Sequence, residues 1–293
     1  MSKKLVWLVT GTSSGLGREL VLAILARGDQ VIATGRSRSF DALAPLKQKG
    51  AAVLELDVTA PLEELENIAA AAERIYGRVD VLVNNAGAYT TPGIIEDQTP
   101  DETLQQFNIN LFGPLNVARA FLPYMRERRS GVVAWMGSVG GCSPIPNSGL
   151  YCATKAAMRS ISQSLDADLA PFNVRSICFE FGFFRAGLTH PDRVPPLNQR
   201  IPAYKEIAEN INAMFRDVYA TLPGDPTKGV QVLIDVVRGE GGAAEKQVPS
   251  RFAVGSDAYQ MIRDESAKMI ERLEEWRDVV CSTDMDDIVV PTA

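Results

Sequence analysis

The sequence predicts an α/β protein with a doubly wound fold, in which a mainly parallel sheet of about seven strands carries helices on both faces. Short apolar segments rich in β-branched residues alternate with longer segments whose apolar residues recur at helical spacing. The short segments are hydrophobic almost throughout, which is typical of parallel strands buried on both sides. A glycine-rich turn joins the first strand segment to the first helical one.

Each expected strand is a short apolar run that ends at a turn-forming or polar residue. The first ends at the glycine-rich turn, the second follows Gly28, and the third ends at Asp57. The fourth runs directly into Asn84, and the later ones end before glycine-containing segments. The expected strands span residues 5–10, 30–33, 52–56, 79–83, 132–136, 174–179 and 252–254.

The helical segments between them have recognisable start and stop residues. Gly28 closes the first helix, and Pro61 opens the alanine-rich second one. Gly113 and Pro114 are expected to divide a long third segment into two helices. The expected helices span residues 19–27, 61–76, 99–128, 151–169, 226–238 and 256–277.

No repeat or low-complexity linker divides the chain, so residues 1–293 are expected to form a single Rossmann-type domain. The proline-rich region 183–225 interrupts the alternation and is interpreted as an irregular substrate-side insertion. Residues 256–293 are interpreted as a C-terminal helix and tail.

The composition excludes several function classes. The chain is 46% hydrophobic and 23% charged, as in a soluble globular protein. Its net charge of −6 argues against a nucleic-acid partner. A single histidine and four cysteines without a CxxC pair exclude a Ser-His-Asp triad and predict no metal site. The N-terminal apolar run is too short for a signal peptide, so a cytoplasmic protein without an integral membrane segment is expected.

The turn Thr-Gly-Thr-Ser-Ser-Gly-Leu-Gly follows the first strand and opens the first helix. Glycines there let the backbone approach a pyrophosphate, whose charge the helix N-terminus holds. The alternative is a glycine-rich turn without a ligand. The candidate cofactor-binding residues of this turn are Gly11, Thr12, Ser13, Ser14, Gly15, Leu16 and Gly17.

The end of the second strand carries a signal for the kind of dinucleotide. An acidic residue there would bind a ribose 2′-hydroxyl, but the sequence has Arg36, Ser37 and Arg38. Two arginines can pair with a 2′-phosphate, so NADP(H) is expected in preference to NAD(H). The alternative is that these arginines are solvated loop charges.

Four polar residues form a candidate catalytic set. Tyr151 and Lys155 are four residues apart on one expected helix and share a face. Ser138 ends the fifth strand, and Asn110 lies in the helical segment after the fourth. The alternative for the Tyr–Lys pair is a solvated helix face.

With these residues the sequence resembles the short-chain dehydrogenase/reductase family over roughly residues 5–255. The family's TGxxxGxG motif corresponds to residues 10–17, its NNAG motif to residues 84–87, and its Ser…YxxxK set to Ser138, Tyr151 and Lys155. The resemblance implies an oxidoreductase that interconverts a carbonyl and a secondary alcohol, with Tyr151 as general acid/base.

The resemblance also implies roles for the other candidate residues. Ser138 would bond the substrate oxygen, Lys155 the nicotinamide ribose, and Asn110 would support a proton path to Lys155. A free phenol has a pKa of about 10, which Lys155 and the bound oxidised cofactor are expected to lower. The remaining cofactor contacts implied by the family are Asp57 and Val58 at the adenine, Asn84, Ala86 and Gly87 along the ribose wall, and Gly182 after the sixth strand.

The sequence departs from the family pattern after the sixth strand. Phe181 replaces the usual proline, and Ala186 stands where a threonine would bond the nicotinamide carboxamide. A backbone N–H of the same loop is the expected substitute. Instead of binding the adenine, Asp57 could be a strand-end or helix-capping residue. His190 is interpreted as a loop residue and Cys152 as a packing residue.

Many apolar residues are expected to line the substrate site, which predicts a bulky lipophilic carbonyl or alcohol of steroid, retinoid or polyketide type. The alternative is that they pack the insertion onto its own domain. They are Val139, Ile145, Pro146, Leu150, Phe183, Phe184, Leu188, Val194, Leu197, Ile201, Tyr204, Ile207, Ile211, Met214 and Phe215.

Two other functions remain open at this point. The altered loop is compatible with a family scaffold used for non-redox chemistry, such as a cyclase or isomerase. A nucleotide-sensing protein that binds NADP(H) without turnover is the other, although it would have no need of the Ser–Tyr–Lys set. By analogy with the family, a homodimer or homotetramer formed through the long helices is expected.

Overall fold

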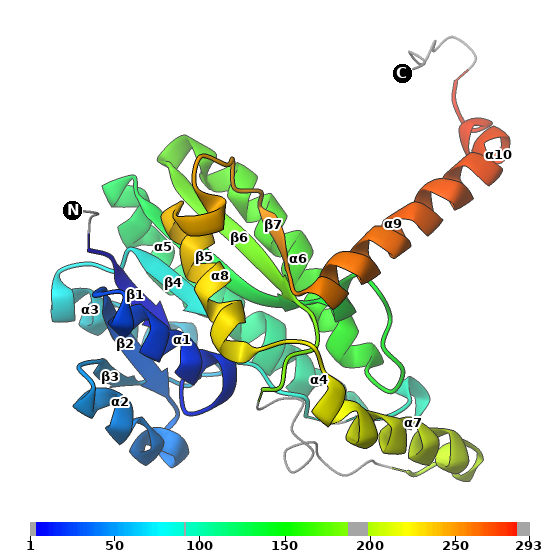
Figure 1. Cartoon of the computed structure of the whole chain (residues 1–293), viewed down its shortest axis with the longest axis horizontal. Helices are drawn as coiled ribbons and strands as arrows, with labels where there is room; N and C mark the ends of the chain where they lie inside the picture. The colour runs from blue at the N-terminus through cyan, green and yellow to red at the C-terminus, as the bar shows by residue number, and fades with distance from the viewer. Residues whose placement is uncertain (1–3, 91, 187–198, 286–293) are drawn as a thin grey trace.

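A computed structural model describes residues 4–90, 92–186 and 199–285. Within them a sheet of seven strands has the order β3-β2-β1-β4-β5-β6-β7, and every pairing is parallel (Figure 1). The doubly wound α/β prediction is therefore confirmed. The strands are β1 (Val6–Val9), β2 (Gln30–Gly35), β3 (Ala52–Glu55), β4 (Val81–Asn84), β5 (Gly131–Ser138), β6 (Val174–Phe181) and β7 (Arg251–Val254).

Helices cover both faces of this sheet, because alternate side chains of each strand point to opposite sides. Trp7 and Val9 of β1 join the core under α1, α2 and α8, whereas Leu8 joins the core under α3, α5 and α6. The α-helices are α1 (Gly15–Ala26), α2 (Ala44–Gln48), α3 (Leu62–Tyr76), α4 (Pro100–Phe107), α5 (Gly113–Arg128), α6 (Gly149–Leu169), α7 (Lys205–Val218), α8 (Pro226–Arg238), α9 (Ser256–Glu275) and α10 (Arg277–Cys281).

The strand order places the candidate site. The chain passes from β1 outward to β3, then returns to place β4 on the other side of β1. The loops that leave the carboxyl ends of β1 and β4 therefore run to opposite sides of the sheet, which opens a crevice between them. All the candidate motifs follow the carboxyl ends of strands.

The long helical segment divides into two helices as the sequence predicted, but its irregular part lies before Gly113 and not at Gly113 and Pro114. Its irregular part is a π-helical turn, Asn108–Phe112, and α5 begins directly after it with Gly113 and Pro114 in its first turn. Proline is tolerated there because a first-turn N–H has no intrahelical acceptor. A Cβ on Gly113 would lie 2.6 Å from the Val58 carbonyl oxygen, so this glycine permits close packing rather than a break.

Part of the region expected to be irregular is helical. Residues 205–218 form α7 (Figure 1). Arg200 fixes the chain just before it, donating to both Glu102 carboxylate oxygens at 2.6 and 2.9 Å and to Asp97. The predictions for Leu188, His190, Val194 and Leu197 lie outside the described residues.

α9 leaves the end of β7 and points away from the sheet, and α10 follows it after the non-helical residue Trp276 (Figure 1). Of all the helices in the described ranges, none is long and apolar enough to cross a membrane.

Candidate active site

The glycine-rich turn after β1 has the backbone shape that the sequence predicted. Gly11 and Gly15 have φ of +69° and +60°, in the left-handed region that favours glycine. A Cβ on Gly17 would lie 2.3 Å from the Asn85 side-chain nitrogen. That same nitrogen donates to the Thr10 and Gly11 carbonyls at 2.7 and 3.0 Å. Asn85 thus fixes the turn from the neighbouring loop, a role that sequence reasoning did not assign.

The other residues of the turn divide into supporting and exposed groups. Thr12 is buried, and its backbone N–H and its hydroxyl both donate to the Thr34 carbonyl, which ties the turn to β2. Leu16 packs against the core. Ser13 and Ser14 are partly exposed, and in the described chain the Ser14 side chain makes no capping bond to α1. The N-terminus of α1 therefore keeps the geometry of an anion site.

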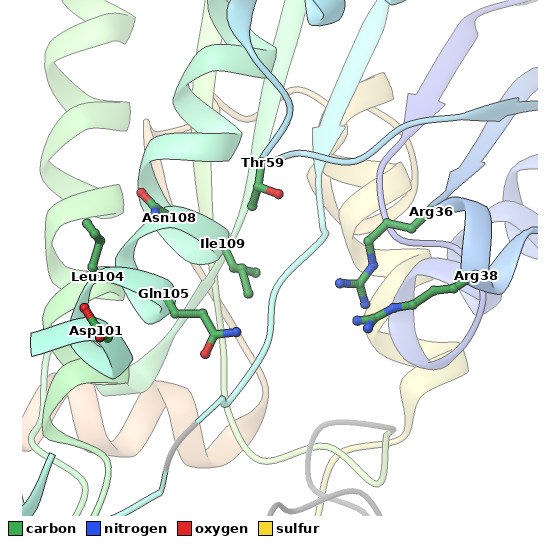
Figure 2. A pocket seen from close by; sticks show the side chains of 8 residues that line it. All are labelled: Arg36, Arg38, Thr59, Asp101, Leu104, Gln105, Asn108 and Ile109. Atoms are coloured by element: carbon green, nitrogen blue, oxygen red, sulfur yellow. The ribbon is translucent and has the colours of Figure 1, made fainter. Parts of the chain in front are cut away.

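Two arginines that follow β2 border a cavity of about 460 Å³. Figure 2 shows the Arg36 and Arg38 guanidinium groups close together on one side and residues of α4 and the π-helical turn on the other. Ser37, between the arginines, is exposed. The full lining is Arg36, Arg38, Thr59, Asp101, Leu104, Gln105, Asn108 and Ile109.

The polar residues after β3 and β4 differ in whether their side chains already have hydrogen-bond partners in the described chain. Asp57 accepts from the Thr59 N–H and hydroxyl at 2.9 and 2.7 Å, so its carboxylate closes a local turn. Val58 is buried in the core. Asn84 is 1% exposed, yet neither polar atom of its amide has a hydrogen-bond partner among the described residues. An unpartnered buried amide at the crevice fits a site whose polar contacts a dinucleotide would complete.

The backbones of the two crevice loops touch. A Cβ on Gly11 would lie 2.8 Å from the Ala86 Cα, and the Ala86 N–H donates to the Thr10 hydroxyl at 2.9 Å. A Cβ on Gly87 would contact the side chains of Asn110 and Lys155 at 3.4 and 3.9 Å. The NNAG segment therefore connects the glycine turn to the candidate catalytic residues.

Ser138, Tyr151 and Lys155 come together, although they lie on β5 and α6. Ser138 ends β5, and its hydroxyl is hydrogen-bonded to that of Tyr151 in the first turn of α6. The Lys155 Nζ lies 5.7 Å from the centre of the Tyr151 ring. It donates to the Met136 carbonyl of β5 at 2.7 Å, which holds the ammonium below the crevice.

Burial governs the protonation of this pair. It raises the pKa of the Tyr151 phenol to about 12, and among the described residues the Ser138 hydrogen bond opposes this rise. It also lowers the pKa of the Lys155 ammonium to about 8. Among the described residues Lys155 is not one that shifts the Tyr151 pKa, and the lowering expected from the bound oxidised cofactor stays a prediction.

Asn110 lies in the π-helical turn, not in a regular helix, and is buried. Its side chain pairs with both backbone groups of Ala88, accepting from the N–H at 2.8 Å and donating to the carbonyl at 2.9 Å. Its Nδ2 is 3.5 Å from the Thr154 hydroxyl on α6. Asn110 therefore joins the loop after β4 to the helix that carries Tyr151.

Most backbone N–H groups of the described loop after β6 are already hydrogen-bonded and cannot bind a nicotinamide carboxamide. The N–H groups of Gly182, Phe183, Arg185 and Ala186 are engaged by Val254, Asp257, Gly224 and Phe184, respectively. The Ala186 side chain packs against the core. The expected backbone substitute for the missing threonine is therefore unavailable at these four residues.

Two apolar residues expected in the substrate lining are core residues instead. Phe184 is buried, and its ring lies edge-on to Phe181 at 5.2 Å under α8. Val139 is also buried. Ile145 and Leu150 are only partly buried next to Tyr151, and they remain candidates for the lining.

Sequence reasoning missed Tyr89 and Asn147. The Tyr89 ring lies edge-on to Tyr151 at 5.7 Å, and its hydroxyl bonds the Asn147 carbonyl and the Ser148 hydroxyl. Asn147 also donates weakly to the Ala208 carbonyl of α7, at 3.4 Å. The only sequence signal was the position of Tyr89 two residues after the NNAG segment.

Comparison with known proteins agrees with this geometry. Residues 5–195 match the family model described as short chain dehydrogenase. The chain is 33% identical over 202 residues to 3-ketodihydrosphingosine reductase of Bacteroides thetaiotaomicron, covering 68% of this chain and 71% of that protein.

Solved structures agree over almost the whole chain. A short-chain dehydrogenase from Streptomyces avermitilis is 35% identical with a TM-score of 0.82, covering 97% of this chain and 100% of that one. An actinorhodin polyketide ketoreductase variant solved with NADPH is 25% identical with a TM-score of 0.70, covering 88% and 98%. The chain belongs to the short-chain dehydrogenase/reductase family and is an oxidoreductase of that type.

Proposed function

We propose that this protein uses NADP(H) to interconvert a carbonyl and a secondary alcohol on a bulky lipophilic substrate of steroid, retinoid or polyketide type. The observation that carries the proposal is the meeting of Ser138, Tyr151 and Lys155 beside the glycine turn. A phenol, a hydroxyl donor and an ammonium at one crevice are the groups that carbonyl reduction requires.

In the proposed reduction, the chain binds the carbonyl oxygen and supplies a proton. The bound cofactor supplies the hydride to the carbonyl carbon. The Ser138 hydroxyl donates a hydrogen bond to the carbonyl oxygen as negative charge develops on that oxygen. The Tyr151 phenol then transfers its proton to the same oxygen. Lys155, whose pKa of about 8 keeps it mostly protonated at neutral pH, would hold the nicotinamide ribose hydroxyls. Asn110 positions α6 through its contact with Thr154.

The preference for NADP(H) is supported by Arg36 and Arg38, which border one cavity and face the same space. Guanidinium groups form paired, charge-assisted bonds with phosphate oxygens. Contacts are proposed for the residues of the glycine turn, for Arg36–Arg38, and for Asn84, Ala86 and Gly87. The polyketide ketoreductase that resembles this chain was solved with NADPH, which agrees with the proposal.

A lipophilic substrate is supported by the partly exposed apolar residues near Tyr151 and on α7, among them Ile145, Leu150, Ile207 and Met214. The related proteins named as a 3-ketodihydrosphingosine reductase and a polyketide ketoreductase agree with it. We also propose a cytoplasmic location, where reducing conditions would keep the four cysteines, all free here, as thiols.

The test is NADPH consumption with a panel of lipophilic ketones, comparing the wild type with Tyr151→Phe. Loss of the proton donor should lower kcat about 10²–10⁴-fold while NADPH binding, measured by fluorescence, is unchanged. Tyr76→Phe, at the far end of α3, is the matched control and should keep full activity. NADPH binding without hydride transfer to any ketone would refute the proposal in favour of a sensor or a non-redox enzyme.

The cofactor preference has a separate test. Arg36→Ser and Arg38→Ser should each raise KM for NADPH about tenfold, because each exposed guanidinium contributes about 1.5 kcal/mol to phosphate binding. KM for NADH should not change. Arg74→Ser on α3 is the control, and an equal effect on both cofactors would contradict the assignment.

A further inference from the structure

The C-terminal helix pair α9–α10 forms an arm that leaves the body of the molecule. Its first residues contact the body: Ala258 is buried, and Asp257 accepts from the Phe183 N–H at 2.6 Å. From Ser266 to Met285 every residue is exposed. Figure 1 shows the arm pointing away from the sheet with no other described element beside its outer part.

This arm carries a largely apolar stripe whose outer part, from Ser266 onward, no other described element covers. Exposed fractions on its outer part run from 49% at Met269 to 62% at Val279. Most helices in proteins are stabilised by packing of an apolar face, and no other described element provides such packing for the outer arm. The other exposed apolar residues of the outer arm are Ile270, Leu273, Trp276 and Val280.

The stripe has the spacing of a coiled coil. Its residues follow one another at alternating intervals of three and four, which is the heptad pattern of core positions. The positions on the opposite face are mostly charged, as in a helix whose one side is buried. The stripe consists of Tyr259, Ile262, Ser266, Met269, Leu273, Trp276 and Val280.

We propose that the arm binds the arm of a second copy of this chain as an antiparallel pair. Such a pair is symmetric about a two-fold axis. When two copies of the stripe run in opposite directions, the stripe residues of one copy lie level with stripe residues of the other. When Ser266 lies level with the partner's Met269, Ile262 lies level with the partner's Leu273, and Tyr259 with the partner's Trp276. Each layer thus contains one residue from each half of the stripe.

The charges beside the stripe select the antiparallel orientation. In the antiparallel pair, Glu265 faces the partner's Arg272, and the two-fold axis generates a second, identical contact. In a parallel pair Arg272 would face the partner's Arg277, and this repulsion would occur twice. The antiparallel pair also places the two bodies at opposite ends of the arms.

Charge also argues against a lipid surface as the occupant. Residues 256–281 contain seven Asp and Glu and four Lys and Arg, which gives 4 − 7 = −3. Helices that lie on anionic membranes carry a basic polar face instead. A second copy, by contrast, provides an apolar layer and places its Arg272 opposite Glu265.

The test is the mass in solution of the full chain, measured by analytical ultracentrifugation over a range of concentrations. The wild type should be a dimer or a multiple of one. Leu273→Asp places two carboxylates in apolar layers and should raise the dissociation constant about a hundredfold or more. Ala267→Asp, on the opposite face of α9, is the matched control and should leave it unchanged. A monomeric wild type, or a Leu273→Asp dimer of wild-type affinity, would overturn the proposal.

Charge exchange tests the orientation. Glu265→Arg and Arg272→Glu should each weaken the dimer about tenfold, and the double exchange should restore it. If Arg272→Glu alone strengthens the dimer, the arms are parallel and the antiparallel proposal is wrong. Circular dichroism and NADPH binding show that each variant is folded. Sedimentation with phosphatidylcholine–phosphatidylserine vesicles, without dimer formation, would identify a membrane as the occupant and refute the proposal.

Discussion

Replacing Lys155 by methionine should stabilise the unliganded protein while removing its activity. The Lys155 side chain is buried, and burial lowers the pKa of its ammonium from 10.5 to about 8. One pKa unit corresponds to about 1.4 kcal/mol, so at neutral pH the charged ammonium destabilises the fold by about 3 kcal/mol. Lys155→Met removes this charge and keeps most of the volume. It also loses the bond to the Met136 carbonyl, at about 1–2 kcal/mol, which leaves a net gain of about 1–2 kcal/mol.

The gain should depend on pH in a definite direction. Between pH 8 and 10.5 the unfolded wild-type chain binds a proton at Lys155 that the native chain does not. The free energy of unfolding of the wild type therefore receives a contribution that rises with pH in this window. Lys155→Met lacks it, so its advantage over the wild type should shrink by about 2–3 kcal/mol between pH 7 and pH 10.

The assay is urea unfolding of both proteins, without cofactor, at pH 7 and pH 10. Lys49→Met, at an exposed lysine after α2, is the control and should show no pH-dependent difference from the wild type. If Lys155→Met is destabilised by the same amount at both pH values, then burial does not penalise the ammonium and the reasoning is wrong.

Three further substitutions test contacts around the crevice. Gly17→Ala should abolish NADPH binding, measured by fluorescence, because the added Cβ displaces Asn85; retained affinity would mean that the turn adapts. Tyr89→Phe should lower the free energy of unfolding in urea by about 1 kcal/mol, because the phenol hydroxyl that bonds Ser148 is lost. It should also lower kcat while leaving KM for NADPH unchanged. Asp257→Ala frees the loop after β6 and should raise KM for NADPH; an unchanged KM would separate this carboxylate from the cofactor site.

Features set by local pattern could be predicted from the sequence. The buried strands read as apolar runs because both of their faces are covered, and their order along the chain indicated a doubly wound sheet. The turn at Gly11 and Gly15 was predictable because a left-handed backbone favours glycine. The face shared by Tyr151 and Lys155 followed from helical geometry alone.

Features set by contacts between distant residues could not be predicted. The bulky apolar pair Phe183 and Phe184 looked like substrate lining, but the path of the loop turns Phe184 inward onto Gly224 and Gly229. Tyr89 reaches Tyr151 only because β4 and β5 are neighbours in the sheet. The pKa values at the site follow from burial, which the spacing of Tyr151 and Lys155 does not reveal.

The bonds of Asn85 have a consequence for how the cofactor site forms during folding. The turn after β1 is held by an amide 74–75 residues further along the chain. A fragment that ends after β3 contains all the glycines but lacks the side chain that fixes the turn. The bonds of Thr12 to β2 can form earlier, but the Asn85 bonds require β4 to pair with β1. Nucleotide affinity during refolding should therefore follow the closing of the sheet centre, not the formation of the first helix.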